Sequence, residues 1–147
     1  MSESEPVRVT CVREVTLAET RALRQSVLRP HEAIDDLAVE EPAGTFAVGA
    51  FDDTRLIAVG LVAPSDDRGA WRVRGMATVA DARGRGAGAA VLDALLLHAG
   101  ACGASRVWCN ARTPARRFYE RAGFSATSDV FELPHIGPHV VMGRAVS

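Results

Sequence analysis

The chain of 147 residues contains no lysine, because all 17 of its basic residues are arginine. It therefore cannot supply the Gly-Lys-Ser/Thr end of a Walker-type phosphate loop. It has only three cysteines, an odd number without Cys-x-x-Cys spacing, which predicts neither a disulfide framework nor a zinc site. We expect all three to be buried structural thiols. The net charge of −1 argues against a nucleic-acid partner bound through a broad basic face.

Long apolar runs and targeting signals are also missing. No apolar run approaches the length that crosses a bilayer, and the short segment 1–6 is acidic, unlike a signal peptide. Unpaired thiols without a signal peptide predict a cytoplasmic protein. The four histidines show no metal-binding spacing, so we expect no metal site. The length suits one domain, residues 1–147.

The clearest pattern that is present is the glycine-rich segment Arg83-Gly84-Arg85-Gly86-Ala87-Gly88. An extended stretch, 71–79, precedes it, and a helix-forming run, 86–101, continues from it. A helix that begins here directs N–H groups and the positive end of its dipole into the turn, which favours a phosphate. Arg83 and Arg85 add two positive charges. The pattern therefore predicts a pyrophosphate-binding turn.

A dinucleotide-binding fingerprint is formally present as well. Gly84, Gly86 and Ala89 fit G-x-G-x-x-A. The next strand-like run, 106–110, ends in asparagine where that fingerprint needs an acid, and too little chain follows to complete a doubly wound sheet. The dinucleotide interpretation is thus the weaker of the two.

Turn signals and hydrophobic periodicity predict a mixed α/β domain of the α+β type. A capping box at Thr16–Glu19 opens the first helix, and Pro30 limits its end. Thr113 followed by Pro114 is expected to cap and begin another helix. Extended segments are expected at 7–12, 45–51, 55–63, 71–79, 106–110, 124–133 and 139–145, and a short helical turn at 33–39.

A second motif follows the last of these helix starts: Ala115-x-x-Phe118-Tyr119-Glu120-x-x-Gly123-Phe124. It is similar to the A-x-x-F-Y-E-x-x-G-F helix of the GNAT superfamily of N-acetyltransferases, and Arg83-x-x-Gly86-x-Gly88 resembles the acetyl-CoA loop of the same superfamily. The predicted order of elements also resembles the GNAT order over nearly the whole chain. Gly137-Pro138-His139-x-x-Met142 and Leu23-Arg24-x-x-Val27 are similar to segments of ElaA-like members.

The resemblance implies a fold and an activity. The fold is a GNAT-like central mixed, mostly antiparallel sheet of about six to seven strands, flanked by helices and splayed between the fourth and fifth strands. The activity is acetyl-CoA-dependent N-acetyl transfer directly to a primary amine, with a small molecule ahead of a peptide or protein amine. Family members often dimerise, so a homodimer is one expected assembly. No membrane partner is expected.

The resemblance also assigns roles to residues. The Met76 N–H holds the thioester carbonyl, and Tyr119 gives a proton to the departing thiolate. Asn110 either lines the cofactor or makes a β-bulge. The residues expected to bind acetyl-CoA are Met76, Ala77, Thr78, Arg83, Gly84, Arg85, Gly86, Ala87, Gly88, Ala89 and Asn110.

Several alternatives stay open at this point. The general base is one of His31, Glu32, Asp35, Asp36, Glu40, Glu41, His135 and His139. A catalytically inactive acyl-CoA-binding or sensory domain would keep the loop but ignore Tyr119. A nucleotide-binding module of another fold would bind a nucleoside triphosphate or dinucleotide and ignore CoA.

Overall fold

The computed structural model describes residues 5–134 and 136–146, except for the side chains of residues 39 and 40. In chain order the elements are β1 (Cys11–Glu14), α1 (Leu17–Leu28), the 3-10 helix η1 (Ile34–Glu40), β2 (Phe46–Asp52), β3 (Arg55–Pro64), β4 (Ala70–Thr78), η2 (Ala80–Ala82), α2 (Ala87–Ala101), β5 (Arg106–Arg112), η3 (Thr113–Ala115), α3 (Arg116–Arg121), β6 (Ser125–Ala126), β7 (Phe131–Leu133) and β8 (Gly137–Ala145).

The described strands form one eight-stranded sheet in the order β1-β2-β3-β4-β5-β8-β6, with β7 also paired to β8. Only the β4–β5 pair is parallel, and the other described pairs are antiparallel. The mixed, mostly antiparallel sheet is therefore confirmed, with more strands than expected.

The extra strand arises because the segment 124–133, expected as one strand, divides into β6 and β7. Residues 127–130 leave the ladder between them. The Ser128 hydroxyl accepts the Val141 N–H at 2.9 Å, so a side chain takes the place of a strand carbonyl. The first strand was expected at 7–12 but lies at Cys11–Glu14. The reason is that β2 ends at Asp52 and offers no partner to residues 7–9.

Two expected helix starts have different outcomes. The capping box at Thr16 is confirmed: its hydroxyl accepts the Glu19 N–H at 3.1 Å, and the Glu19 carboxylate accepts the Thr16 N–H at 3.0 Å. The expectation that Thr113 caps an α-helix is wrong. The Arg116 N–H donates to the Thr113 carbonyl, and this i→i+3 bond makes the first turn a 3-10 helix ahead of α3.

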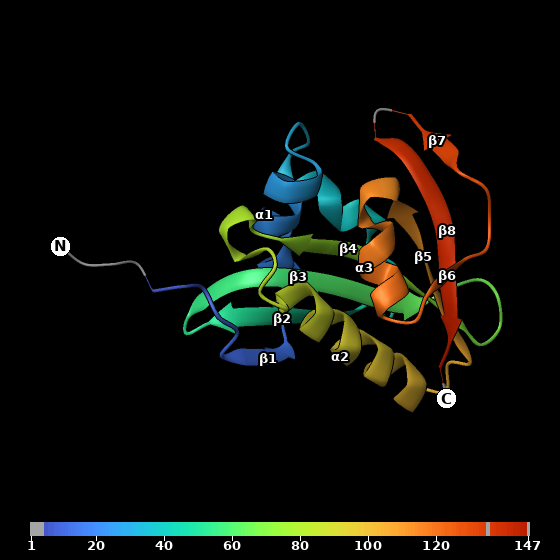
Figure 1. Ribbon diagram of the computed structural model, residues 1–147, viewed down its shortest axis with the longest axis horizontal. Helices are drawn as coiled ribbons and strands as arrows, with labels where there is room; N and C mark the ends of the chain where they lie inside the picture. Colours follow the sequence, from blue (N-terminus) through green and yellow to red (C-terminus); the bar gives the residue numbers. More distant parts are fainter. Residues whose placement is uncertain (1–4, 135, 147) are drawn as a thin grey trace.

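Helices cover both faces of the sheet (Figure 1). The largest core cluster lies between the sheet and α2, and includes Val91, Leu92 and Leu95, which are fully buried. On the opposite face α1 packs against β3 and β4, where Leu23 contacts Val59 and Ala77. The sheet thus separates an α2 face from an α1 face. Among the described helices none is long and apolar enough to span a bilayer.

Candidate active site

The parallel strands β4 and β5 stay together at one end only. Within the described residues they pair over 70–72 of β4 and 106–108 of β5. Residues 73–78 of β4 then continue without a strand beside them on that side, and the two strands diverge (Figure 1). The separation expected between the fourth and fifth strands is confirmed, and we call it the β4–β5 gap.

A β-bulge shapes the β4 side of the gap. Residues 75 and 76 together lie opposite the single residue Gly60 of β3. Gly75 has a φ of 64°, in the left-handed region that glycine adopts without a steric penalty. A Cβ added to Gly75 would lie 3.0 Å from Nε of Arg24, so the bulge rests directly on this arginine of α1.

N–H groups of the unpaired part of β4 point into the gap. The Val79 N–H donates to the Ile57 carbonyl of β3 at 2.9 Å, and successive N–H groups along a strand point to opposite sides. The Thr78 N–H is therefore directed away from β3, and the Met76 N–H shares that direction. Ala77 lies between these two residues, and its side chain packs on the α1 face of the sheet.

The first turn of α2 lies where β4 ends and presents its N–H groups outward. Its N-cap is Gly86, with a φ of 82°, and no side chain in the described part of the chain caps this turn. The Ala90 N–H donates to the Gly86 carbonyl at 3.0 Å, so the N–H groups of 87–89 precede the first bond of the helix. Arg83 and Arg85 are exposed beside them. This geometry suits a bound anion.

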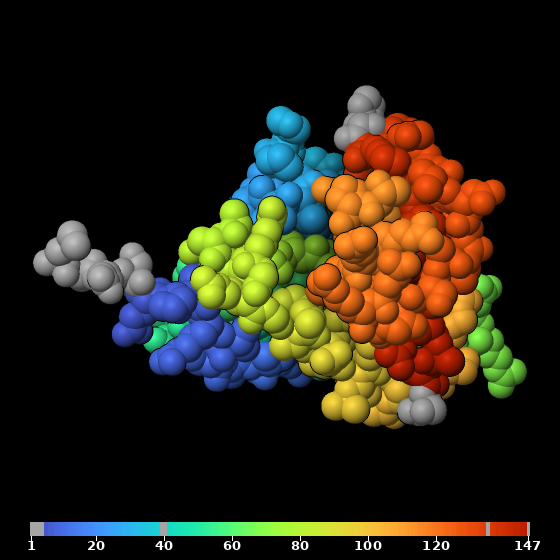
Figure 2. Space-filling model, viewed as in Figure 1, coloured from blue at the N-terminus to red at the C-terminus, as the bar shows by residue number. Residues whose placement is uncertain are grey.

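The end of β4, the start of α2 and the helix α3 meet at one point. A Cβ on Gly88 would lie 3.2 Å from the Phe118 ring and 3.4 Å from Oγ1 of Thr78. Figure 2 shows the yellow-green segment at the start of α2 on one side of a seam and the orange α3 on the other. Two expected site residues, Thr78 and Gly88, are thus neighbours.

Asn110 lies on β5, beyond the last residue that pairs with β4. The register between β5 and β8 is continuous there, with Asn110 opposite Val141. The bulge alternative for Asn110 is therefore wrong, and the residue forms part of the β5 side of the gap.

Tyr119 of α3 is buried on the α2 face, with 6% of its surface exposed. Its ring packs edge-on against Phe118 and Phe124, and its hydroxyl lies beside the thiol of Cys109 on β5. Burial raises the pKa of Tyr119 above its ordinary value, and the Cys109 thiol raises it further. The phenol is therefore protonated at any pH at which the protein works.

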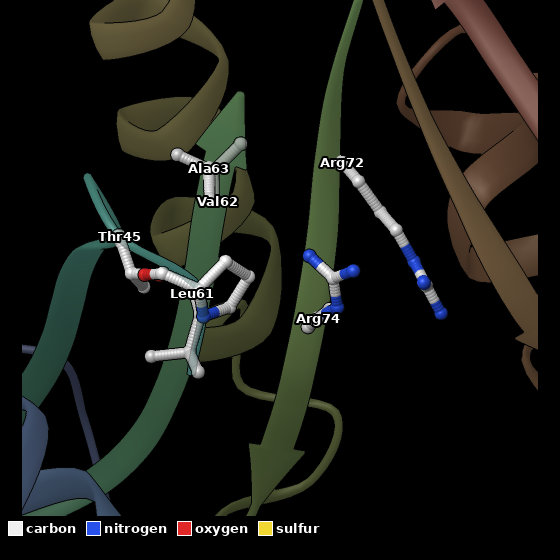
Figure 3. A pocket seen from close by; sticks show the side chains of 7 residues that line it. Thr45, Leu61, Val62, Ala63, Arg72 and Arg74 are labelled. Atoms are coloured by element: carbon white, nitrogen blue, oxygen red, sulfur yellow. The ribbon is translucent and has the colours of Figure 1, made fainter. Parts of the chain in front are cut away.

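A pocket of about 350 Å³ opens on the α1 face, beside the paired end of β4 and β5. Its lining includes Pro42, Asp66, Asp67, Arg72, Arg74 and Trp108. The same two arginines also line a crevice with Thr45 and Leu61, and they extend from β4 in Figure 3. The Arg72 guanidinium lies over the Trp108 ring, 4.9 Å from its centroid, so β5 forms the opposite wall.

The match to known proteins agrees with this geometry. The sequence model of the acetyltransferase (GNAT) family matches residues 12–124. The chain belongs to the GNAT acetyltransferase family. It is 31% identical over 142 residues to the uncharacterized N-acetyltransferase YitI of Bacillus subtilis (strain 168), covering 92% of this chain and 95% of YitI.

Solved structures share the GNAT fold. Aminoglycoside 6'-N-acetyltransferase complexed with coenzyme A superposes with a TM-score of 0.78 at 12% identity, covering 94% of this chain and 98% of that one. Escherichia coli ElaA superposes with a TM-score of 0.75 at 18% identity, covering 90% of this chain and 97% of ElaA. The predicted family, fold and enzyme class, an acyltransferase, are thereby confirmed.

The structure separates the candidates for the general base of this GNAT domain. Glu41 binds Arg21 at 2.7 Å and Arg24 at 2.6 Å. The hydrogen bond from Arg21, followed by that from Arg24, lowers the pKa of Glu41, which makes its carboxylate a weak base. His139 is buried on β8, and its Nδ1 donates to the Gly137 carbonyl at 2.8 Å.

The structure says less about the other candidates for the general base. His31, Glu32, Asp35 and Asp36 are exposed on the segment after α1. The Glu40 side chain and His135 lie outside the described residues. Within the described part of the chain, no three His, Cys, Asp or Glu side chains come together as metal ligands.

Sequence reasoning missed two features of this site. All three cysteines were expected to be buried, but Cys11 and Cys102 are exposed, and the buried Cys109 contacts Tyr119. The pairing of Arg72 with Arg74 on the α1 face was also missed. Their i, i+2 spacing on a predicted strand was the available signal, because such residues share a face.

Proposed function

We propose that this GNAT protein transfers an acetyl group from acetyl-CoA directly to a primary amine, with a small-molecule acceptor favoured over a peptide or protein amine. The observation that carries this proposal is the meeting of an uncapped helix N-terminus with the β4–β5 gap. The pyrophosphate of acetyl-CoA would bind the N–H groups of residues 87–89, with Arg83 and Arg85 beside it. The pantetheine arm would then extend along β4 as an added strand.

The proposed reaction is a single displacement. The amine nitrogen attacks the thioester carbonyl carbon, and the oxygen that gains negative charge accepts the Met76 N–H. As the carbon–sulfur bond breaks, the Tyr119 hydroxyl gives its proton to the departing sulfur, which leaves as the thiol of CoA. The proton that the attacking nitrogen loses passes through a base or water to the Tyr119 phenolate, which restores the phenol and leaves the N-acetyl product and CoA. The remaining expected cofactor contacts come from Ala77, Thr78, Gly84, Gly86, Gly88 and Asn110.

A matched pair of variants at Gly86 tests the proposed cofactor site. Asn and Asp have nearly the same shape, and both tolerate the left-handed backbone that Gly86 adopts. Asp adds a negative charge beside the proposed phosphate site. Calorimetric titration with acetyl-CoA should give Gly86→Asn an affinity near that of the wild type and Gly86→Asp one at least about tenfold weaker.

Three other outcomes contradict the proposal in different ways. Equal affinity of the two variants would mean that the phosphates do not lie at this turn. Tight acetyl-CoA binding by a wild type that transfers acetyl to no amine would instead indicate an inactive acyl-CoA-binding domain. Binding of a dinucleotide but not of CoA would point to the nucleotide-binding alternative.

A further inference from the structure

The pocket on the α1 face lies on the opposite side of the sheet from the start of α2. Arg74 lines the pocket and is the last β4 residue before the Gly75 bulge, so the pocket adjoins the β4–β5 gap. A molecule in the pocket therefore reaches the gap from the face that α2 does not cover. The volume of about 350 Å³ suits a ligand the size of an amino acid.

Two arginines give this pocket its chemistry. Arg72 and Arg74 stand two residues apart on one face of β4, so their side chains project side by side. The Arg72 guanidinium lies over the Trp108 ring, so β5 positions it beside the pocket. Guanidinium edges fit planar carboxylates in bidentate fashion.

The lining of this pocket carries charges of both signs. Asp66 and Asp67 line the pocket from the turn between β3 and β4, while Pro42 supplies an apolar wall. A polyamine would bring only positive charge to Arg72 and Arg74. An amino acid brings a carboxylate for the arginines together with an amine.

We propose that the acceptor is a small amino acid whose carboxylate binds Arg72 and Arg74 and whose amine points into the β4–β5 gap. This inference rests on the proposed acetyl transfer and specifies its substrate class. Arg74, which is nearer to Met76 along the strand, holds the carboxylate at the end of the pocket closest to the thioester. Arg72, fixed by Trp108, sets the orientation of the carboxylate.

The test compares each common amino acid with its own carboxamide as acceptor, using acetyl-CoA and the full-length protein. The amide lacks the negative charge, and its amine is less basic. A pocket that does not recognise carboxylates would therefore give the amide the higher kcat/KM. We expect the best amino acid to have a kcat/KM at least about tenfold above that of its amide.

Arg72→Gln and Arg74→Gln should each lower kcat/KM for the acid about 10- to 100-fold, and should change that for the amide less than about twofold. The KM for acetyl-CoA should stay unchanged, which a misfolded variant would not achieve. Arg74→Lys should recover part of the loss, because it restores the charge without the fork. Arg68→Gln is the matched control, since Arg68 is exposed on the same turn but outside the pocket lining.

Faster acetylation of the amides by the wild type would overturn the inference while leaving the proposed acetyl transfer in place. A preference for the acid that survives in both glutamine variants would also overturn it. If neither acids nor amides are acetylated, the inference fails as well, and turnover with amines that lack a carboxylate then decides whether the proposed transfer fails with it.

Discussion

Tyr119 combines two properties that work against each other in its proposed role as general acid. Burial keeps its proton in place over the whole range of working pH, but the raised pKa makes the phenol a weaker acid. Proton transfer to a fully formed thiolate would be uphill, so we expect the hydroxyl to act while the carbon–sulfur bond is breaking. Until then the hydroxyl lies beside the Cys109 thiol of β5.

We therefore predict that Tyr119→Phe lowers kcat at least about tenfold and changes the acetyl-CoA dissociation constant less than about twofold. The variant removes one oxygen and keeps the ring contacts with Phe118 and Phe124. Steady-state kinetics and calorimetry measure the two quantities. Because the pKa of Tyr119 is raised, the wild-type kcat should show no alkaline loss from this group below about pH 10. Unchanged turnover in the variant would remove Tyr119 from the mechanism.

Single residues of the site differ in how far sequence could reveal them. Tyr119 is the only tyrosine and stands in a recognisable motif, so it was predictable. Its partner Cys109 was not, because the contact depends on how α3 packs over β5, ten residues away along the chain. A cysteine on a strand carries no local signal of the side chain that will cover it.

At the scale of elements, β4 is one strand with two different edges. Its edge toward β3 is hydrogen-bonded, while residues 73–78 are unpaired toward β5. The hairpin joining β2 to β3 and the α1 capping box were predictable from local residues, and both are present. The division of 124–133 into β6 and β7 was not, because it depends on a hydrogen bond between Ser128 and distant Val141.

Hydrogen exchange on β4 should reveal whether a ligand completes the strand. We predict that acetyl-CoA slows exchange of the Met76 and Thr78 amides, because the pantetheine arm would accept their hydrogen bonds. The Val79 amide is the internal control, since it already donates to Ile57. Amide exchange followed by NMR with and without acetyl-CoA measures all three. Protection that appears equally at Val79, or only far from β4, would contradict the proposed position of the cofactor.

At the scale of the whole molecule, the two proposed binding sites lie on the two faces of the sheet. The start of α2 and α3 lie on one face, and the pocket of Arg72 and Arg74 opens on the other. The GNAT resemblance predicted the cofactor side because its motifs are short and contiguous. The pocket is lined by residues that are far apart in the sequence, among them Pro42, Asp66, Arg74 and Trp108. No local sequence pattern predicts that these residues lie together.

The buried thiol at the centre of the fold should make stability depend on alkaline pH. Burial raises the pKa of Cys109 from its ordinary 9.0 to about 12. Between these pH values the unfolded chain binds fewer protons than the folded chain, so the free energy of unfolding falls as the pH rises, by at most about 1.4 kcal/mol per pH unit. The effect is absent below about pH 9 and is complete above about pH 12.

Urea unfolding at several pH values between 8 and about 10 tests this dependence. Whatever its effect on stability at pH 8, Cys109→Ala should reduce the amount by which the free energy of unfolding falls between pH 8 and about pH 10. Cys102→Ala is the control, because Cys102 is exposed. Parallel pH curves for the wild type and Cys109→Ala would show that the thiol ionises equally in the folded and unfolded chains.

The bulge at Gly75 also affects which substitutions on β4 can change one proposed binding site without changing the other. One inserted residue shifts the phase of β4, so that Arg72 and Arg74 face α1 before it, whereas Met76 and Thr78 turn their side chains toward α2 after it. Mutations at Arg72 and Arg74 should therefore alter the proposed acceptor pocket without disturbing the proposed cofactor contacts of Met76 and Thr78. A library randomised at positions 72, 74 and 108 should accordingly yield new acceptor preferences on an unaltered acetyl donor site, which makes this strand a natural place for directed evolution to begin.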